Sequence, residues 1–386
     1  MISRTAYETL MRLAQGFPVL AITGPRQSGK TTLARSSFPD KAYVSLEDPD
    51  TRMLAESDPR GFLSHYTDGC IIDEAQRSPQ LFSYLQGFVD EHPVPGRYVL
   101  TGSQQFGLLS GITQTLAGRV GLVQLLPFAM QELASVDMLP TDADAVMQTG
   151  LYPPLYDRKL APTDWFPAYI TTYIERDVRQ LVNVRDLSAF QRFLKMCAAR
   201  TGQLLNLSSL ATDCGITHNT ASSWISILEA SYIIFLLRPH FANFNKRLVK
   251  TPKLYFIDTG LAAWLLGIRD KEQITFHALR GALFENLVIT EFLKGRFNRG
   301  RQPDMYFWRD SKGLEVDLLL EEGLNMIPVE IKSGQTIVPD YLAGLKKWCD
   351  LSGAPERSAM LVYGGATESR TQNVTIVPWG HLSAVA

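Results

Sequence analysis

The chain has 386 residues, of which 45% are hydrophobic, and 38 basic against 39 acidic residues leave a formal net charge of −1. This length exceeds one ordinary core, so we expect two or three domains, and the apolar content excludes a disordered chain. A net charge close to zero neither supports nor excludes nucleic-acid binding, because a nearly neutral chain can still carry a local basic patch.

The scattered cysteines and the apolar runs bear on location. The four cysteines form no CxxC pair, which disfavours a zinc site or a disulfide framework and makes a reducing cytoplasm the default. The first residues lack the basic-then-apolar layout of a signal peptide, and the clearest apolar run, Tyr232–Leu237, is too short to cross a bilayer. We therefore expect a cytoplasmic protein without a membrane partner.

Residues 1–135 are predicted to form an α/β domain around a mostly parallel sheet. Short apolar runs, each followed by turn or polar residues, are typical of strands that are buried on both faces. The expected strands are Val19–Thr23, Ala42–Leu46, Cys70–Asp73, Tyr98–Thr101 and Leu122–Leu126.

A phosphate-binding loop is predicted directly after the first strand. Its glycines let backbone N–H groups approach phosphate oxygens, and the helix that follows adds a favourable dipole. Lys30 is expected to reach the β- and γ-phosphates of ATP, and the Thr31 hydroxyl to bind Mg²⁺. The order strand, loop, helix disfavours a chance match. The expected nucleotide-binding residues are Gly24, Pro25, Arg26, Gln27, Ser28, Gly29, Lys30, Thr31 and Thr32.

Polar residues at the ends of two further strands complete this predicted site. Asp73 is placed to hold Mg²⁺ through water, and Glu74 to orient and deprotonate the attacking water. The alternative is a pair of solvated acids at a strand end. After the fourth strand, Ser103 is the first candidate to lie beside the γ-phosphate and Gln104 the second; a turn-filling role is the competing interpretation.

On these motifs the chain resembles the AAA+ ATPases, and most closely a widespread prokaryotic group marked by GPRQSGKTT, IIDEAQ, LTGSQ and LAGR. The four motifs stand here as Gly24–Thr32, Ile71–Gln76, Leu100–Gln104 and Leu116–Arg119. The resemblance implies that Asp73 and Glu74 form the Walker B pair, and that Ser103 or Gln104 is the sensor.

The resemblance also implies a homo-oligomer in which Arg119 acts as an arginine finger on a neighbour's site. Pairing of Arg119 with an acid on its own surface is the alternative. The second, lid-borne sensor arginine is not identified, although Arg176 and Arg179 are candidates that Glu175 and Asp177 could instead neutralise.

Residues 136–200 are predicted to form a linker and a helical lid, in which Leu139–Pro154 is a linker or the entry to the lid. Residues 201–270 then have the layout of a helix-turn-helix, in which Gly215 supplies the turn and Thr217 caps the second helix. The region resembles a winged-helix domain, which the same group of ATPases carries.

A basic cluster follows the second helix of this motif and contains no acidic residue, which suits phosphate contacts. Phe241 and Phe244 lie within it and could stack on bases. The second helix has no Lys or Arg, which disfavours sequence readout in a groove, and packing against protein is the alternative. We expect nucleic acid as a partner, DNA more than RNA. The expected contacts are Arg238, Lys246, Arg247, Lys250 and Lys253.

A carboxylate-bearing hairpin is predicted in residues 271–386, from Glu315–Leu320 and Met326–Lys332. Strand alternation puts Asp317, Glu330 and Lys332 on one face. Glu285, on a predicted helix upstream, can point to the same place. Two or three carboxylates with a lysine can hold a divalent metal and direct water at phosphate.

This hairpin resembles the PD-(D/E)XK nuclease fold of restriction endonucleases and archaeal Holliday-junction resolvases. The resemblance implies that Glu285, Asp317 and Glu330 bind a second Mg²⁺ or Mn²⁺, and that Asp317, Glu330 and Lys332 are catalytic. The alternative is an inactive relic that keeps only an ion pair of Lys332 with Asp317 or Glu330.

Together, these features predict Mg²⁺-dependent ATP hydrolysis coupled to nucleic-acid binding, with metal-dependent cleavage of DNA or RNA as a further expectation. The alternative function is an ATP-dependent switch or sensor whose inactive nuclease-like domain only binds. The expected fold class is α/β: an AAA+ P-loop core with a parallel sheet, then a helical lid and a winged helix, and then an α/β restriction-endonuclease-like domain.

Overall fold

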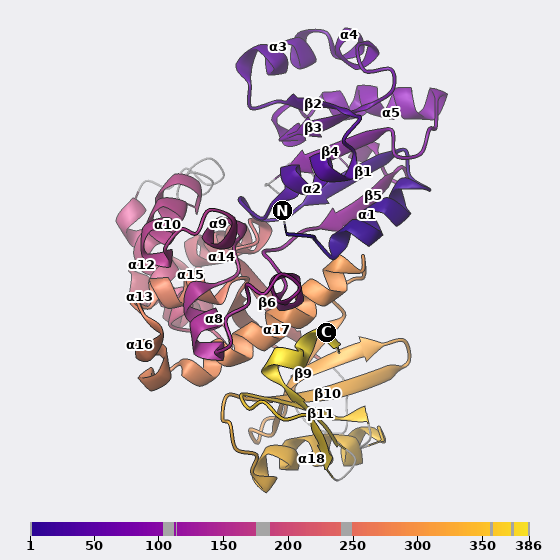
Figure 1. The fold of residues 1–386 in the computed structure, drawn as a ribbon. Helices are drawn as coiled ribbons and strands as arrows, with labels where there is room; N and C mark the ends of the chain where they lie inside the picture. Colours follow the sequence, from indigo (N-terminus) through magenta and orange to yellow (C-terminus); the bar gives the residue numbers. More distant parts are fainter. Residues whose placement is uncertain are drawn as a thin grey trace. The chain divides into compact units, whose positions relative to one another are not determined.

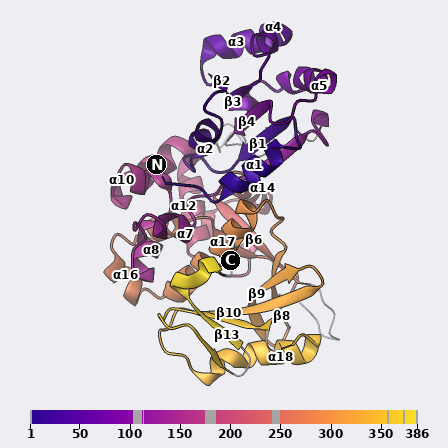
Figure 2. The ribbon, with the colours of Figure 1, turned by 45° about the vertical axis from the view of Figure 1, so that its right-hand side comes forward.

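The computed structural model describes residues 2–102, 112, 114–174, 186–240, 249–355, 358–371 and 374–384. The chain divides into two compact units (Figures 1 and 2). The first comprises Met1–Phe128, Ala230–Tyr232 and Arg296–Gln302, and the second comprises Ala129–Glu229, Ile233–Gly295 and Pro303–Ala386.

The first unit is built on a five-stranded sheet whose order is β2-β3-β4-β1-β5 and whose paired strands all run parallel. The strands are β1 (Val19–Thr23), β2 (Ala42–Ser45), β3 (Cys70–Asp73), β4 (Tyr98–Gly102) and β5 (Val120–Gln124). The parallel sheet is confirmed. The fifth strand lies two residues earlier than expected, and β4 separates β1 from β3.

Helices cover both faces of this sheet, because alternate strand residues are apolar on both sides. In β1, Val19 and Ala21 pack in one core with α4 and α5, while Leu20 and Ile22 pack in a second core with α1 and α2. The helices are α1 (Ala6–Ala14), α2 (Lys30–Ser37), α3 (Pro49–Ser57), α4 (Pro59–Ser64), the short 3₁₀ turn η1 (Ala75–Arg77) and α5 (Leu81–Glu91).

The second unit begins with helices that include a helix-turn-helix. The described elements of this stretch are α7 (Met130–Ala134), α8 (Ala143–Thr149), α9 (Pro153–Asp157), α10 (Pro162–Tyr169), the π-helical turn η2 (Ile170–Ile174), α12 (Leu187–Ala198), α13 (Leu207–Cys214) and α14 (His218–Ala230). The stretch Leu139–Pro154, expected as a linker or lid entry, contains the helix α8: Asp142 caps it by accepting from the Asp144 N–H, and its Val146 and Met147 are buried.

The helix-turn-helix layout follows the sequence prediction closely. Gly215 ends α13 in the left-handed region, at φ +69°, where a glycine meets no steric penalty. The Thr217 hydroxyl accepts a hydrogen bond from the Thr220 N–H at 3.1 Å and so caps the start of α14.

The remaining strands form one mixed sheet of eight, in the order β12-β13-β11-β10-β9-β8-β6-β7. They are β6 (Ile234–Pro239), β7 (Lys253–Phe256), β8 (Met305–Arg309), β9 (Glu315–Glu322), β10 (Asn325–Lys332), β11 (Met360–Tyr363), β12 (Ser369–Thr371) and β13 (Val374–Pro378). The expected hairpin is present as antiparallel β9 and β10, with Leu318 opposite Val329.

The helices of this part are α15 (Thr259–Leu265), α16 (Lys271–Phe276), α17 (Arg280–Asn298), η3 (Pro339–Leu342), α18 (Ala343–Ser352) and η5 (Trp379–Ala384). Strands β6 and β7, which belong to the predicted winged helix, pair within the same sheet as the hairpin. The sheet therefore draws strands from both sides of residue 270, where a domain boundary was predicted.

Candidate functional site

The loop between β1 and α2 has the backbone of a phosphate cradle. Gly24, Gln27 and Gly29 adopt positive φ angles of 147°, 64° and 93°. A Cβ added to Gly24 would lie 2.0 Å from the carbonyl oxygen of Leu125, so no other residue fits at the start of the loop. Backbone strain and close packing thus explain the glycines that the sequence shows.

Lys30 stands at the first turn of α2 and turns back over this loop. Its ammonium donates to the carbonyl oxygens of Gly24, at 3.1 Å, and of Pro25, at 2.7 Å. Lys30 is only 6% exposed, so the loop holds a buried positive charge at a helix N-terminus. Both features favour a polyanion.

Asp73, at the end of β3, accepts hydrogen bonds from hydroxyl groups of three other elements. Its Oδ1 accepts from Thr31 of α2, at 3.0 Å, and also from Thr101 of β4. Its Oδ2 accepts from Tyr43 of β2, at 2.8 Å. Burial and the bond to Asp73 raise the pKa of Tyr43 to about 12, so the phenol remains a donor. The structure therefore brings Thr31 and Asp73 together, as expected for a magnesium site.

Glu74 follows directly in a left-handed conformation, with φ +54°. For a residue other than glycine this conformation is strained by roughly 1–3 kcal/mol, and such strain clusters at functional sites. The Glu74 Oε2 accepts from the Gln76 side-chain amide at 2.6 Å, which orients the carboxylate.

Three residues of this site escaped the sequence reasoning. Thr101 is fully buried and contacts Asp73 from β4, whereas the predicted sensor residues Ser103 and Gln104 lie outside the described residues. A threonine ending an apolar run before Gly102 was the available signal. Tyr43 had no local signal.

The third residue, Tyr232, is 209 residues away from Thr23 in the chain. Its phenol lies 3.0 Å from the Thr23 hydroxyl and accepts from the Gln124 side chain at 3.1 Å. Thr23 directly precedes the loop, so Tyr232 contacts the strand that carries the loop.

Arg119 pairs within its own chain. Its guanidinium donates to both carboxylate oxygens of Asp90 on α5, at 2.5 and 2.8 Å, and the pair lowers the pKa of Asp90. This is the geometry of the alternative interpretation, an arginine that pairs on its own surface. The candidates Arg176 and Arg179 lie outside the described residues.

The structure describes three of the five expected nucleic-acid contacts, and two of these three are at the surface. Arg238 and Lys250 are exposed. Lys246 and Arg247 lie outside the described residues, as do Phe241 and Phe244.

Lys253 must be removed from this set. It is 4% exposed, and its ammonium bonds to Glu285, at 2.9 Å, and to Glu315. A cation that two carboxylates already neutralise inside the protein is not available to phosphate.

The hairpin places Asp317, Glu330 and Lys332 together, as predicted. The Lys332 ammonium donates to Glu330 Oε1 at 2.5 Å and to Asp317 Oδ2 at 3.4 Å, and the latter oxygen also accepts from the Ile331 N–H at 2.9 Å. Burial, and then the charge of Asp317, raise the pKa of Glu330 to about 8. Glu330 Oε2 is buried and has no hydrogen-bond partner in the described part of the chain.

Glu285, on α17, is bound to cationic and phenolic groups rather than exposed to a shared cavity. Its Oε1 accepts from Lys253 and, at 2.5 Å, from the Tyr255 hydroxyl, and burial raises its pKa to about 6. Within the described ranges, no group of three or more His, Cys, Asp or Glu side chains could hold a metal ion. The structure therefore gives no geometric support to a second metal, because Lys332 pairs with Asp317 and Glu330, and Lys253 pairs with Glu285.

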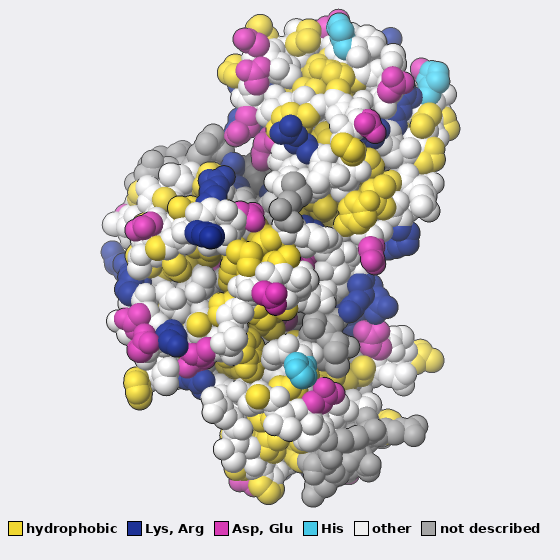
Figure 3. All heavy atoms as spheres, in the orientation of Figure 1, with side chains coloured by type: hydrophobic (Ala, Val, Ile, Leu, Met, Phe, Trp, Pro, Cys, Tyr) yellow, Lys and Arg dark blue, Asp and Glu magenta, His cyan; other side chains and the backbone are white. Residues whose placement is uncertain are grey.

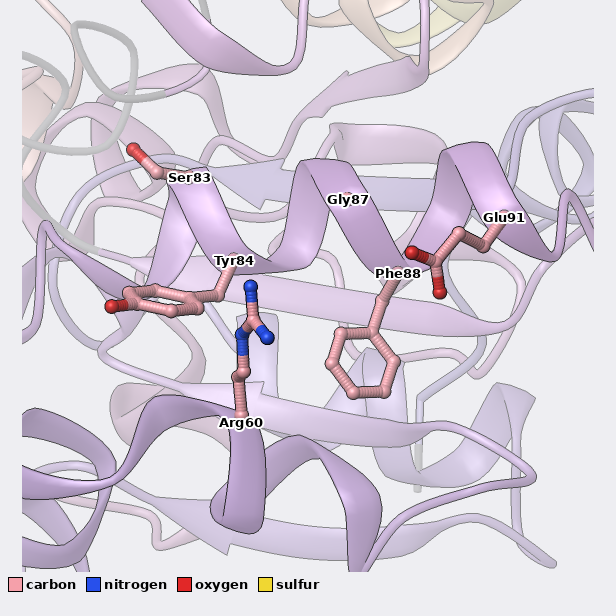
Figure 4. Close-up of a pocket in the computed structure, with 6 residues that line it drawn as sticks. All are labelled: Arg60, Ser83, Tyr84, Gly87, Phe88 and Glu91. Carbon is pink, nitrogen blue, oxygen red and sulfur yellow. The ribbon is translucent and has the colours of Figure 1, made fainter.

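A hollow of about 390 Å³ lies elsewhere, between α4 and α5 (Figure 4). Arg60 projects from α4 toward α5 between Tyr84 and Phe88. The residues that line the hollow are Arg60, Ser83, Tyr84, Gly87, Phe88 and Glu91. None of them belongs to the phosphate loop.

The surface and the helices add two observations. On the face drawn in Figure 3, basic and acidic side chains are interspersed rather than gathered by sign. Of the helices in the described ranges, none combines the length and apolarity needed to cross a membrane.

Comparison with known families first defines the class. Residues 16–134 match the family described as an AAA domain. Residues 141–272 and 280–382 match two domains of unknown function, DUF8612 and DUF4143. The phosphate loop, the parallel sheet and the first match together define an AAA-type P-loop ATPase domain.

The chain also has relatives of similar sequence. It is 33% identical over 338 residues to uncharacterized proteins Rv2008c of Mycobacterium tuberculosis and Mb2031c of Mycobacterium bovis, which covers 86% of this chain and 74% of each relative. The chain belongs to the same protein family as these two mycobacterial proteins.

Solved structures resemble the chain only distantly. The Walker-type ATPase paby2304 of Pyrococcus abyssi is 15% identical, with a TM-score of 0.47 over 69% of this chain and 96% of that one. Aquifex aeolicus DnaA, bound to AMPPCP, is 15% identical with a TM-score of 0.31, over 58% and 85%. Scores this low carry no argument about function.

Proposed function

We propose that the chain binds ATP with Mg²⁺ at the β1–α2 loop and hydrolyses it, and that the second unit couples this cycle to nucleic acid. The observation that supports the ATP site most strongly is the convergence of the Thr31 hydroxyl and the Asp73 carboxylate, 3.0 Å apart, beside a loop that buries Lys30.

The residues present fit Mg²⁺. A hydroxyl and a carboxylate are hard oxygen ligands, and Mg²⁺ is usually held by one or two such groups together with substrate phosphates and water. Thr31 would coordinate the ion directly and Asp73 through water. When bound, the ion neutralises charge on the phosphate oxygens.

The chain's own groups supply the remaining chemistry. The N–H groups of the loop and the Lys30 ammonium bind and stabilise the β- and γ-phosphates. Glu74 orients the attacking water and accepts its proton, because it follows the strand that carries Asp73. Ser103 or Gln104 would contact the γ-phosphate.

Phosphate release from ATP, measured with and without Mg²⁺ on the full chain, tests this proposal. Turnover that requires Mg²⁺ supports it. A protein that neither binds nor hydrolyses nucleoside triphosphates contradicts it.

Coupling to nucleic acid rests on the α13–α14 helix-turn-helix and on the exposed Arg238 and Lys250, with Lys246 and Arg247 as further contacts. DNA is proposed over RNA because helix-turn-helix motifs are DNA-binding elements, whereas the lack of Lys and Arg in α14 disfavours base readout in a groove. Stimulation of ATP turnover by single-stranded, duplex or branched DNA or RNA tests it. Turnover that no nucleic acid changes favours the second candidate, a nucleotide-dependent switch.

A further part of the proposal is assembly into a homo-oligomer in which Arg119 acts in trans. Arg119 would have to leave Asp90 to reach a neighbour's site. Turnover per subunit that rises with protein concentration supports the trans role, and a flat rate across the association range contradicts it.

The most specific part of the proposal is metal-dependent cleavage of nucleic acid by Asp317, Glu330 and Lys332. The alternative, an inactive nuclease-like domain that only binds, is favoured by the ion pairs of Lys332 with Asp317 and Glu330 and by the pair of Lys253 with Glu285. Incubation with DNA and RNA substrates and Mg²⁺ or Mn²⁺, with and without ATP, separates the two.

A further inference from the structure

An arginine outside every motif described above contacts the phosphate loop. Arg4 precedes α1 and is only 9% exposed. Its Nη1 donates to the carbonyl oxygen of Ser28 at 2.6 Å, and its Nη2 donates to the carbonyl oxygen of Leu126 at 2.7 Å. The guanidinium carbon lies 4.8 Å from the centre of the Phe128 ring. All four residues belong to the first unit.

The bond to Ser28 orients a peptide of the loop. In a planar trans peptide, the carbonyl and the N–H point in opposite directions. Because the Ser28 carbonyl points to Arg4, the N–H of Gly29 points away from Arg4. Gly29 opens α2 with φ +93°, and a Cβ there would lie 3.4 Å from Arg4 Nη1. Loop N–H groups at this position are those that cradle phosphates.

The bond to Leu126 joins the end of the loop to its beginning. Leu125 packs its carbonyl oxygen against Gly24, and its N–H donates to the Thr23 carbonyl at 2.7 Å. One guanidinium therefore connects Ser28, near the loop's end, with the segment that packs against the loop's start. The fork of Arg can reach two carbonyls at once, whereas a lysine ammonium presents a single charged point.

We propose that Arg4 is a positioning residue of the nucleotide site, which presets the Ser28–Gly29 peptide for the phosphates of a nucleoside di- or triphosphate. This inference rests on the proposed ATP binding. Arg4 acts through the loop backbone and touches no reacting atom. Loss of Arg4 weakens phosphate binding equally in the bound ground state and in the transition state. The substitution therefore raises KM and the ADP dissociation constant more than it lowers kcat.

The test compares Arg4→Gln and Arg4→Lys with Arg12→Gln, a matched control. Arg12 lies on α1, is exposed, and donates a hydrogen bond to the Arg299 carbonyl oxygen at 3.4 Å, away from the phosphate loop. ADP binding, the steady-state constants for ATP and the thermal melting point are measured for all the full-length proteins.

We expect Arg4→Gln to raise the ADP dissociation constant and KM at least about tenfold while kcat stays within about threefold. Arg4→Lys should fall between Arg4→Gln and the wild type, and Arg12→Gln should match the wild type. A further variant, Arg4→Ala, leaves room for a free guanidinium ion. Added guanidinium salt should restore its ADP affinity, whereas a sodium salt at the same ionic strength should not.

Unchanged ADP affinity in folded Arg4→Gln and Arg4→Lys, or a lowered melting point as their sole effect, overturns the proposal. If Arg4→Gln does not fold, Arg4→Lys decides by the same criterion. A wild-type protein that binds neither ADP nor ATP overturns the proposed function itself, and with it this inference.

Discussion

Asp73 is the residue on which the proposed ATP site depends, because hydroxyls from α2, β4 and β2 all donate to its carboxylate. A carboxylate fixed by Thr31, Thr101 and Tyr43 has little rotational freedom. Preorganisation of this kind lets a site act without reorganising during the reaction.

Removing the charge of Lys30 and the base at Glu74 should have different results. Lys30→Ala should abolish nucleotide binding or turnover, because the phosphate charge loses its partner. Glu74→Gln should still bind ATP but turn over about 10²–10⁴-fold more slowly, since the shape is kept and the base is lost. Binding and phosphate-release assays on both variants measure this, and a Glu74→Gln enzyme at the wild-type rate would falsify the assignment.

Thr101→Val should weaken the Mg²⁺ dependence of turnover. The substitution keeps the side-chain shape but removes one of the two hydroxyls that donate to Asp73 Oδ1, and a hydrogen bond to a charged group contributes about 1.5–3 kcal/mol. We expect a higher Mg²⁺ concentration at half-maximal rate, read from a Mg²⁺ titration at saturating ATP. Tyr43→Phe, a more exposed donor to the same carboxylate, should shift the titration less.

At the level of elements, the strand order explains the first site and the β9–β10 hairpin explains the second. Because β4 lies between β1 and β3, its last residues stand beside both the loop and Asp73. In the hairpin, antiparallel pairing brings Asp317 and Glu330 to one face, where burial forces them to share the Lys332 charge. Burial of like charges raises a carboxyl pKa.

This hairpin should make stability depend on pH. The Glu330 pKa of about 8 lies above its unfolded value of 4.5, so between these values the folded state holds a proton that the unfolded state has released. The free energy of unfolding should therefore fall as pH rises through this window. Glu285, with a pKa of about 6, adds to the fall at the acidic end, whereas Lys332 titrates above the window.

At pH 9, Glu330→Gln should have a higher free energy of unfolding than the wild type. This difference should vanish near pH 5. One pKa unit corresponds to about 1.4 kcal/mol, so part of the shift suffices for detection. Denaturant unfolding of both proteins at the two pH values measures the difference. A constant difference between pH 5 and pH 9 would show that Glu330 does not titrate in this range.

At the scale of the whole molecule, the two proposed chemistries lie in different compact units. Lys30, Thr31 and Asp73 belong to the first unit, whereas Asp317 and Glu330 belong to the second. Removing one set should therefore leave the chemistry of the other intact.

Asp317→Ala should retain ATP hydrolysis and distinguish a live nuclease from a relic. In a live site, the change removes cleavage with little change in melting. In a relic it removes one partner of Lys332 and lowers the melting point, with no cleavage to lose. Nicking assays and thermal melting on Asp317→Ala and Lys332→Met separate the outcomes, and lost ATP turnover in Asp317→Ala would contradict independent sites.

Local spacing in the chain was enough to predict the strands of the first sheet, the glycines of the loop, the Thr217 cap and the hairpin face with Asp317 and Glu330. Each depends on rules that act over a few residues: period-two alternation, positive φ at glycine, and capping. These features could be read before any tertiary contact was known.

Contacts between distant segments were decided by tertiary packing alone. Arg4 reaches Ser28, Arg119 reaches Asp90, and Lys253 is buried between Glu285 and Glu315. Tyr43 and Thr101 meet at Asp73 because packing selected the order β2-β3-β4-β1 among the possible strand orders. No spacing rule in one sequence states which strands become neighbours, since that choice follows from the burial of two whole sheet faces.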